Sequence, residues 1–381
     1  MITQRQIAER LELSLATVAN ILSERPGLRY AAATRERVLK TAAEMGYQPN
    51  RAAQTVRRRR SNLIGIVHFG AGIEAAHKAN LALAADVCAR GYDYLAVDMN
   101  WHGGSVERVI DELIQARVEG VIISHIQEVF QKEHVDMLTR VGIPVVVVNG
   151  ERRSGASIIC DDVYSAFQAL GRHLIQLGHR RILHLWPAVD RLEENRSIGE
   201  RLKGFRSAIE ERGKWVSFSE EEFFTAWPDQ LPATGGVMGV TVIQDMEKYS
   251  TLNKPVYSFC ERLFAASPLP DAIVCTNDVS AIELIAAGLE HGVRVPADVA
   301  VTGYDNDRIG EYPAFGLTTA EQDISRICAA TVAEICLRIA DPHRPPRQQS
   351  FPSRLILRTS CGMALAAQSR SKATTTDTVR S

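Results

Sequence analysis

The strongest constraint on the fold is a series of short apolar runs that alternate with helix-like segments between residues 63 and 304. The runs are LIGIV (63–67), YLAV (94–97), GVIIS (120–124), PVVVV (144–148), RILHL (181–185), AIVCT (272–276) and VAVTGY (299–304). Strands buried on both faces read as continuous apolar runs and are typical of parallel sheets covered by helices on both sides. Segments 106–117 and 164–177 have the helical pattern that the crossovers require. Residues 63–363 are therefore predicted to form an α/β domain of two doubly wound parallel-sheet subdomains, whose ligand binds at the carboxyl ends of strands.

Residues 1–48 have a different pattern, which predicts an all-α domain. Thr3 and Gln6 have the spacing of a capping box, and Ser14 can cap a second helix after a tight turn. A third helix is expected over residues 34–45. Apolar residues recur at helical spacing in all three helices, namely Ile7, Ala8 and Leu11, then Leu15, Val18, Ile21 and Leu22, then Val38, Leu39, Ala42 and Met45. This arrangement predicts a helix-turn-helix, although small helical bundles that do not bind DNA share the spacing.

The two ends of the chain differ in charge. Residues 1–60 carry 12 Lys or Arg and 5 Glu, a net charge of +7, and the remaining residues carry 32 Lys or Arg and 40 Asp or Glu, a net charge of −8. A basic module on an acidic body favours DNA as a partner. Arg57 to Arg60 are expected to contact phosphates or a narrow minor groove, with a solvated linker as the alternative.

The cysteines do not have the pattern of a metal or disulfide site. They are odd in number and none forms a C-x-x-C pair, so they are interpreted as reduced core thiols: Cys88, Cys160, Cys260, Cys275, Cys328, Cys336 and Cys361. His68, His102 and His125 are each expected to be satisfied polar groups rather than metal ligands. No cofactor is predicted.

The ends of the chain and its hydropathy predict a cytoplasmic protein without membrane contact. No uncharged apolar run approaches the roughly 20 residues of a membrane-spanning helix. The polar run from Ile2 to Arg10 lacks the apolar core of a secretory signal. Residues 364–381 are rich in Ala, Ser and Thr and are predicted to be a disordered tail.

Several runs, in the same order along the chain, closely resemble the lactose-repressor (LacI/GalR) family of transcription regulators. They are LSLATVANILSERPG (13–27), ATRERVLKTAAEMGYQPNRAAQ (33–54), SNLIGIV (61–67), LIQLGHRRILHL (174–185), RLKGFRSAIEERG (201–213), AIVCTNDVSAIELI (272–285), VAVTGYDN (299–306) and LTTAEQD (317–323). The resemblance implies a DNA-binding headpiece over residues 1–48, a hinge helix and linker over 49–62 and a sensor of the periplasmic-binding-protein type over 63–363. It also implies a homodimer that binds a palindromic DNA operator.

The resemblance assigns DNA contacts to the second helix. Leu15, Ala16 and Asn20 match positions that face base edges, and Ser14 and Thr17 match positions that contact phosphate. Asparagine can bond to adenine with both ends of its amide, although many members have arginine at the position of Asn20. Leu15 has a second interpretation, as a core residue of the three-helix bundle. The connection over residues 23–33 is about two residues longer than is usual in the family.

The resemblance also implies that DNA is contacted by the capping residue Thr3 and by residues around the hinge. The hinge residues are Tyr47, Asn50, Ala53, Val56 and Arg57. Asn50 can cap a short helix that enters the minor groove. Val56 stands where the family has a leucine that wedges a base step open. Because valine is shorter and β-branched, a shallower wedge is expected.

The resemblance also assigns a pocket for a small-molecule effector, with a carbohydrate as the expected class. Its residues are Asn149, Ser197, Arg201, Asn277 and Asp305, with Trp227 as a candidate stacking face. Arginine, asparagine and aspartate together supply donors and acceptors for hydroxyl groups. The alternative for Arg201 and Asp305 is a structural ion pair between the subdomains.

Two further hypotheses compete with an effector-controlled repressor. One is a sugar-binding receptor without DNA-binding activity of its own, and the other is a regulator that depends on a corepressor or partner protein. The sequence contains no G-x-S-x-G, P-loop or H-E-x-x-H motif, so an enzyme is not predicted. Whether the effector releases or promotes DNA binding is open at this point.

Overall fold

A computed structural model describes residues 2–23, 28–48, 60–68, 74–99, 105–124, 130–150, 155–187, 196–219, 237–244, 255–265 and 268–362. The chain divides into two compact units, Met1–Ser61 and Asn62–Ser381. Four predicted DNA-binding residues, the candidate Trp227, His102, His125 and the predicted tail lie outside the described residues. The four DNA-binding residues are Asn50, Ala53, Val56 and Arg57.

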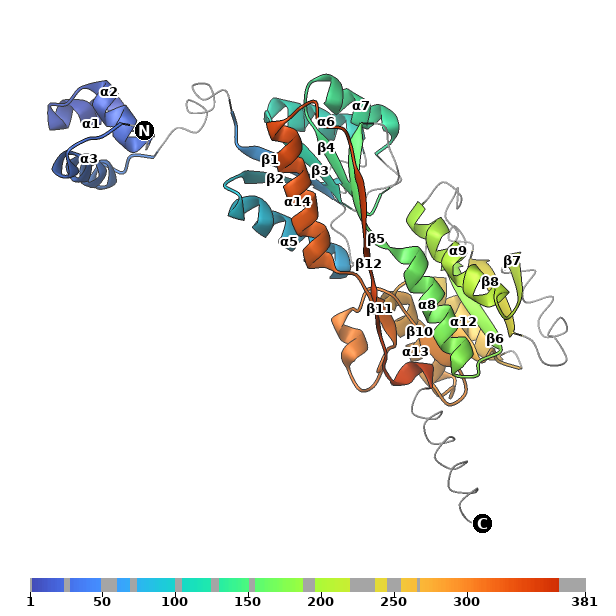
Figure 1. The fold of residues 1–381 in the computed structure, drawn as a ribbon. Helices are drawn as coiled ribbons and strands as arrows, with labels where there is room; N and C mark the ends of the chain where they lie inside the picture. Colours follow the sequence, from blue (N-terminus) through green and yellow to red (C-terminus); the bar gives the residue numbers. More distant parts are fainter. Residues whose placement is uncertain are drawn as a thin grey trace, which may run out of the picture. The chain divides into compact units, whose positions relative to one another are not determined.

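The first unit is a three-helix bundle made of α1 (Gln4–Leu11), α2 (Leu15–Leu22) and α3 (Ala32–Glu44) (Figure 1). All three predicted helices are confirmed, although α3 begins two residues earlier than expected. The core holds two residues from each helix, Ile7, Ala8, Val18, Ile21, Val38 and Ala42. Leu39 was predicted to face inward and this is wrong, because its side chain is 43% exposed. Adjacent residues of a helix lie about 100° apart, so Leu39 turns away where Val38 turns in.

The second unit begins with a six-stranded parallel sheet in the order β12-β5-β4-β3-β1-β2. Its strands are β1 (Leu63–His68), β2 (Asp93–Asp98), β3 (Gly120–Ser124), β4 (Val145–Val148), β5 (Ala156–Asp162) and β12 (Gln348–Pro352). Alternate strand residues pack on opposite faces: Ile64 and Ile66 contact α5 (Glu74–Ala89) and α14 (Ile324–Ala340), and Val67 contacts the other face. That other face is covered by α6 (Val106–Gln115) and α7 (Lys132–Arg140). The first predicted doubly wound subdomain is confirmed.

The second subdomain has a five-stranded sheet in the order β10-β9-β6-β8-β7, and every pair in it is parallel. Its strands are β6 (Arg181–Pro187), β7 (Gly213–Ser219), β8 (Val237–Gln244), β9 (Ala272–Val274) and β10 (Ala300–Thr302). One face packs on α8 (Val163–Gln176) and α9 (Arg196–Glu210), and the other packs on α12 (Pro255–Ala265) and α13 (Asp278–Glu290). The predicted α/β class with two such sheets is therefore confirmed.

The chain crosses between the two sheets at three places. The first crossing joins β5 to α8, the second joins β11 (Thr319–Glu321) to α14, and the third joins β12 to β13 (Arg354–Ile356). β11 and β13 pair antiparallel beside the second sheet, and two short 3-10 helices, η2 (Arg308–Glu311) and η3 (Thr359–Cys361), complete this region. Polar residues placed at these crossings can contact both subdomains.

The seven cysteines are all free thiols, as predicted, but one is not a core residue. Cys160, Cys260, Cys275, Cys328 and Cys361 are buried and Cys336 is partly buried. Cys88 is exposed, so its prediction as a core thiol is wrong. Its helix α5 buries a stripe through Leu83 and Val87, and Cys88 follows on the outer face. No helix in the described part of the chain is long and apolar enough to cross a membrane.

Candidate functional site

The second helix of the bundle presents one of its faces to solvent. Ser14 caps α2, because its Oγ accepts a hydrogen bond of 3.0 Å from the Thr17 backbone N–H. Val18 and Ile21 then point into the core between the helices. The opposite face exposes Leu15 and Ala16. This is the local geometry that a helix needs in order to reach the edges of bases in a major groove.

The structure separates the two interpretations of Leu15. Its side chain is 45% exposed, so the alternative of a core residue is wrong. Thr17 is partly buried, and its Oγ1 lies 2.8 Å from the Ser14 Oγ. Asn20, one turn after Ala16, is also partly buried, and its Nδ2 donates to the Tyr30 Oη at 3.0 Å. Helix α2 thus carries Leu15, Ala16 and Asn20, and the packing of its other face in the core fixes its orientation.

Thr3 and Tyr47 lie at the two ends of the described bundle. Thr3 is the N-cap of α1 and completes the predicted capping box with Gln6. Tyr47 follows α3, and its Oη accepts a hydrogen bond of 2.9 Å from Gln4 Nε2. The residue that precedes the proposed hinge is therefore attached to the first helix.

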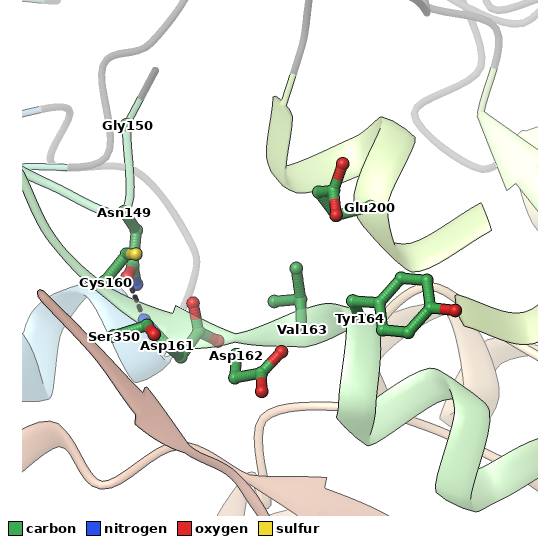
Figure 2. Close-up of a pocket in the computed structure, with 9 residues that line it drawn as sticks. All are labelled: Asn149, Gly150, Cys160, Asp161, Asp162, Val163, Tyr164, Glu200 and Ser350. Atoms are coloured by element: carbon green, nitrogen blue, oxygen red, sulfur yellow. Dashed lines mark hydrogen bonds between the residues drawn. The ribbon is translucent and has the colours of Figure 1, made fainter. Parts of the chain in front are cut away.

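A polar hollow of about 130 Å³ opens in the second unit at the first crossing (Figure 2). Residues of both subdomains line it, namely Asn149, Gly150, Cys160, Asp161, Asp162, Val163, Tyr164, Glu200 and Ser350. Asn149 directly follows β4 and Asp161 is the last residue but one of β5, so the hollow lies at the carboxyl ends of strands of the first sheet. Glu200 faces the crossing from α9. This is the position where ligands of doubly wound sheets bind.

Asn149 links the first crossing to the second. It adopts a left-handed backbone conformation with φ 54°, and its Oδ1 accepts a hydrogen bond of 3.0 Å from the Asp161 backbone N–H. Its Nδ2 donates to Gln322 Oε1 at 3.0 Å. Gln322 Nε2 in turn donates to Asp305 Oδ1 at 2.7 Å. The chain of amides thus joins the first subdomain to the loop that follows β10.

Tyr304 links the first crossing to the third. Its hydroxyl donates to the Asp161 carboxylate and lies 3.0 Å from the Ser353 Oγ. The ring is fully buried and also contacts Phe167. Each of the three crossings therefore places one polar residue, Asp161, Gln322 or Ser353, in a continuous buried network.

Arg201 brings a positive charge to this network from α9. Its guanidinium carbon lies 4.5 Å from the centre of the Tyr304 ring and 5.6 Å from that of Phe167. Nη1 donates to the carbonyl oxygen of Thr276 at 2.5 Å, and Nε is buried without a hydrogen-bond partner among the described residues. No salt bridge joins the described side chains of Arg201 and Asp305, although the positive charge of Arg201 still acts on the Asp305 carboxyl.

Burial shifts the ionisation of the acids in this region. Desolvation raises the pKa of Asp305 to about 7, and the positive charge of Arg201 partly opposes that rise. Burial likewise raises the pKa of Asp161, against a hydrogen bond from Tyr304. Burial also lowers the pKa of His184 to about 3, so its imidazole is neutral. The ionisation of these groups therefore depends on whether water or another molecule surrounds them.

Asn277 has a structural role that the sequence pattern did not reveal. It is the N-cap of α13, and its Oδ1 accepts a hydrogen bond of 2.9 Å from the Ser280 backbone N–H. Ser197 lies in the first turn of α9, where the backbone alone is described. Among the predicted effector residues that are described, Asn149 lines the hollow. Arg201 contacts the ring of Tyr304, and Asp305 accepts a hydrogen bond from Gln322, so these two are connected to the hollow through other side chains.

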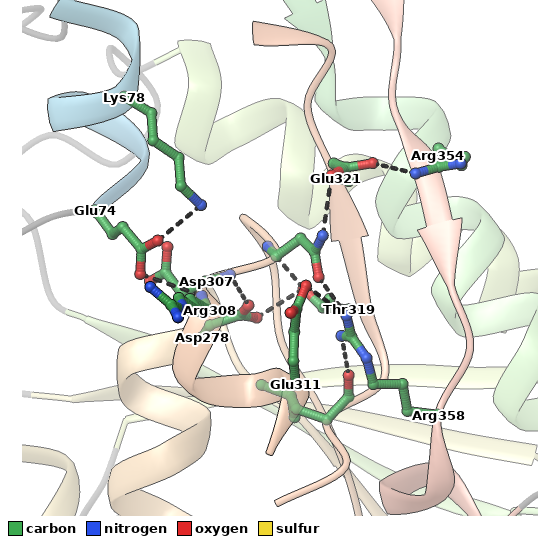
Figure 3. A network of polar contacts seen from close by, with 12 residues as sticks. Glu74, Lys78, Asp278, Asp307, Arg308, Glu311, Thr319, Glu321, Arg354 and Arg358 are labelled. Atoms are coloured by element: carbon green, nitrogen blue, oxygen red, sulfur yellow. Dashed lines mark hydrogen bonds and ion pairs between the residues drawn. The ribbon is translucent and has the colours of Figure 1, made fainter. Parts of the chain in front are cut away.

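A second polar network spans the two subdomains beside α5 (Figure 3). Glu74, on α5 of the first subdomain, accepts a hydrogen bond of 3.1 Å from the Arg308 backbone N–H of the second. Lys78 pairs with the same carboxylate at 2.8 Å. The buried Asp278 accepts from Thr319 Oγ1 and from the Asp307 backbone N–H, each at 2.7 Å, and burial raises its pKa to about 6. The loop after β10 is therefore held by residues from both subdomains.

Sequence reasoning missed three residues of the buried network beside the hollow, of which Asp161 also lines it. These are Asp161, Tyr304 and Gln322, which are separated by up to 161 positions in the sequence. Asp161 and Gln322 each form a hydrogen bond with the predicted Asn149. Gln322 also bonds to the predicted Asp305, and Tyr304 bonds to Asp161. The sequence did contain a signal for Asp161, because this residue follows the apolar residues Ile158, Ile159 and Cys160 near the end of a strand. Polar residues at the ends of buried strands gather at one edge of a parallel sheet.

Comparison with known proteins places this geometry in a family. Residues 172–361 match the model of a periplasmic binding protein-like domain, and residues 78–231 match that of periplasmic binding proteins and the sugar binding domain of the LacI family. The HTH-type transcriptional repressor PurR of Escherichia coli O1:K1 is 27% identical over 367 residues, which cover 94% of this chain and 97% of that protein. The chain belongs to the LacI/GalR family. PurR of Proteus mirabilis, another repressor, is 26% identical over 370 residues and covers the same shares of the two chains.

Solved LacI/GalR structures share the fold. The lac repressor dimer bound to operator and the anti-inducer ONPF superposes with a TM-score of 0.74 at 20% identity, over 94% of this chain and 99% of that one. A LacI family regulator from Enterococcus faecium with bound ribose gives a TM-score of 0.60 at 20% identity, over 78% of this chain and 98% of that one. The named relatives are regulators rather than enzymes.

Proposed function

We propose that this protein is a sequence-specific DNA-binding transcription repressor whose affinity for its operator is controlled by a small-molecule effector. One observation carries the proposal: a single chain joins a basic bundle with an exposed second helix to a two-subdomain unit with a polar pocket at its crossings. Its alignment with PurR repressors over 94% of the chain supports the same function.

The exposed helix α2 is proposed to read DNA. Leu15 and Ala16 offer apolar surface to thymine methyl groups, and Asn20 offers an amide to a base edge. The hydroxyls of Ser14 and Thr17, at the positive end of the helix, suit phosphate oxygens. Thr3, Tyr47, Asn50, Ala53, Val56 and Arg57 are proposed to complete the DNA contacts. The partner is a palindromic operator bound by a homodimer, and repression of chromosomal genes would place the protein in the cytoplasm.

The effector is proposed to be an uncharged carbohydrate. The described lining carries the carboxylates of Asp161, Asp162 and Glu200, and the cation Arg201 is already held by Thr276 and by the Tyr304 ring. Carboxylates accept hydrogen bonds from sugar hydroxyls, whereas they repel a phosphate or carboxylate on a ligand. Asn149, Ser197, Arg201, Asn277, Asp305 and Trp227 remain the proposed effector residues. No catalytic role is proposed for any of them.

Effector binding is proposed to act through the crossings. A ligand that contacts Asp161 and α9 at once favours one relative arrangement of the subdomains, because Asp161, Gln322 and Ser353 lie where the chain passes between them. A change in that arrangement alters how a dimer presents its two DNA-binding units. The sign of the response, release or tighter binding, follows from which arrangement the effector prefers.

A selection of genomic DNA fragments by the purified full-length protein tests this function. The parent protein and an Ala43→Glu control, which adds the same charge at an exposed position of α3, are expected to enrich one palindromic site. Ala16→Glu is expected to lose it, because the new carboxylate would face the DNA. If the parent enriches no site, the repressor is rejected in favour of a sugar-binding receptor or a partner-dependent regulator.

The same protein tests the effector class. Thermal unfolding is followed with neutral monosaccharides and disaccharides and with their phosphorylated and carboxylated derivatives. A rise in the melting temperature with a neutral sugar, absent with its charged derivative, is expected. Stabilisation by the anionic derivatives alone would contradict the assignment of an uncharged ligand.

A further inference from the structure

The amide of Asn20 is held by a residue outside the recognition helix. Asn20 lies in the last turn of α2, and Tyr30 lies ten positions later, just before α3. Asn20 Nδ2 donates a hydrogen bond of 3.0 Å to the Tyr30 Oη. The Tyr30 ring packs against the core of the bundle, so its hydroxyl is fixed relative to all three helices.

This bond limits what Asn20 can present to a base. A free asparagine amide rotates about its last side-chain torsion and can direct either its oxygen or its nitrogen outward. With one N–H bonded to Tyr30, Asn20 keeps its Oδ1 and a single N–H for another partner. Both groups are needed for a two-bond contact with adenine, in which the oxygen accepts from N6 and the nitrogen donates to N7.

We propose that Tyr30 is a positioning residue that sets the base preference of Asn20. This inference rests on the proposed function, because it assumes that α2 enters a major groove. Tyr30 orients the amide before DNA arrives, so the contact with the preferred base loses less rotational freedom on binding. Tyr30 itself contacts no base in this proposal.

A purely structural role for the Tyr30 hydroxyl would have a different outcome. The hydroxyl would then add to the stability of the bundle, and its loss would weaken binding to all sequences equally. A positioning role instead changes the ranking of bases at one position of each half-site. The two roles are therefore separated by sequence preference rather than by affinity alone.

The experiment is a selection from a random DNA library with the full-length parent, Tyr30→Phe, Asn20→Ala and the double variant. Tyr30→Phe keeps the ring in the core and removes the hydroxyl alone. It is expected to relax the preference at the base pair that Asn20→Ala also affects, by roughly fivefold, the equilibrium effect of one net hydrogen bond. In the Asn20→Ala background, Tyr30→Phe is expected to cause no further change.

Ser23→Ala is the matched control. The Ser23 Oγ donates to the backbone carbonyl of Asn20 at 3.3 Å, so its removal affects the same end of α2 without touching the Asn20 amide. Its base preferences are expected to equal those of the parent. Binding of all variants to random DNA, and its salt dependence, is expected to stay unchanged, because no phosphate contact is removed.

Each outcome decides the role of Tyr30. Base preferences that are identical for the parent and Tyr30→Phe would overturn it, as would a Tyr30→Phe effect that persists in the Asn20→Ala background. A parent that enriches no sequence would reject the proposed function itself, and this inference with it. A relaxed preference at the Asn20 base pair alone supports the proposal.

Discussion

Asp305 shows how the fold changes the chemistry of a single residue. Its carboxyl is buried, takes a hydrogen bond from Gln322 and has a pKa of about 7, far above the ordinary value of 3.8. A carboxyl with a higher pKa in the folded chain than in the unfolded chain binds its proton more tightly when folded. Its contribution to stability is therefore present below about pH 4 and is lost as the pH rises to about 7.

Replacement of Asp305 by asparagine is expected to remove this loss. Asp305→Asn should gain stability relative to the parent between pH 5 and pH 8, by about 1–3 kcal/mol, since each unit of pKa shift corresponds to about 1.4 kcal/mol. The measurement is the free energy of unfolding in urea at the two pH values. Asp161 and Asp278 titrate in the same direction and are present in both proteins, and the charge of Asp278 adds to the rise in the pKa of Asp305.

Asp298→Asn is the control for that titration. Asp298 pairs with Arg294 on the surface, which lowers the pKa of Asp298 to about 2, outside the range from pH 5 to pH 8. Its replacement should leave the pH dependence of the parent unchanged. Equal pH dependence of the parent and Asp305→Asn would show that Asp305 is ionised in the fold and that the assigned pKa is wrong.

At the scale of the elements, helix α9 positions Arg201 by close packing against α8. A Cβ atom on Gly204 would lie 2.1 Å from the carbonyl oxygen of Tyr164 on α8. Backbone atoms cannot rotate away from such a contact, so α9 keeps its distance to α8 because residue 204 has no side chain. Arg201, one turn earlier, owes its place over the Tyr304 ring to this approach.

Gly204→Ala is therefore expected to force the two helices apart and to lower the free energy of unfolding by about 1–3 kcal/mol. Gly288→Ala, in the last turn of α13, is the matched control, because the nearest atoms to its added Cβ lie at an ordinary 3.5 Å. The control should be neutral or more stable by up to about 1 kcal/mol, since alanine is the better helix former. Denaturant unfolding of both variants checks this, and equal changes would refute the packing argument.

At the scale of the whole second unit, the contact between Glu74 and Arg308 joins the subdomains beside α5. The Glu74 carboxylate accepts the Arg308 backbone N–H, and Lys78 lowers the pKa of that carboxylate. The contact lies next to Asp307 (Figure 3). Without it, the loop after β10 would still be joined to the first subdomain through the Tyr304–Asp161 bond and through Gln322 and Asn149.

Glu74→Ala is expected to increase hydrogen exchange at the backbone amides of residues 307–311, by roughly three- to tenfold, because one hydrogen bond that closes this loop is absent. Glu107→Ala, at an exposed carboxylate in the first turn of α6, is the control and should leave those amides unchanged. Mass spectrometry of peptides from this loop gives the measurement. Unchanged exchange in Glu74→Ala would mean that the contact does not hold the subdomains together.

The sequence by itself determined the class of the fold and part of its elements, since the apolar runs predicted β1 to β4, β6, β9 and β10 but not β5, β7, β8 or β12. Helices α1 and α2 follow from the caps Thr3 and Ser14, and the central strands of the two sheets follow from apolar runs such as LIGIV and AIVCT. These signals are local: a cap acts over three residues, and an apolar run reports burial of its own strand. The periodicity alone left Leu15 undecided and misplaced Leu39, since each lies three residues before a core residue, Val18 or Ala42.

The tertiary structure alone decided which residues meet in the pocket and how they ionise. Asn149 meets Gln322 across 173 positions, and Tyr304 meets Asp161 across 143, because three separate crossings bring distant segments to one edge of the sheets. The pKa of Asp305 depends on burial by those segments, and the amide of Asn20 depends on where Tyr30 packs. Contacts and desolvation of this kind depend on the whole fold, whereas helix caps and strand runs depend on neighbours in the chain.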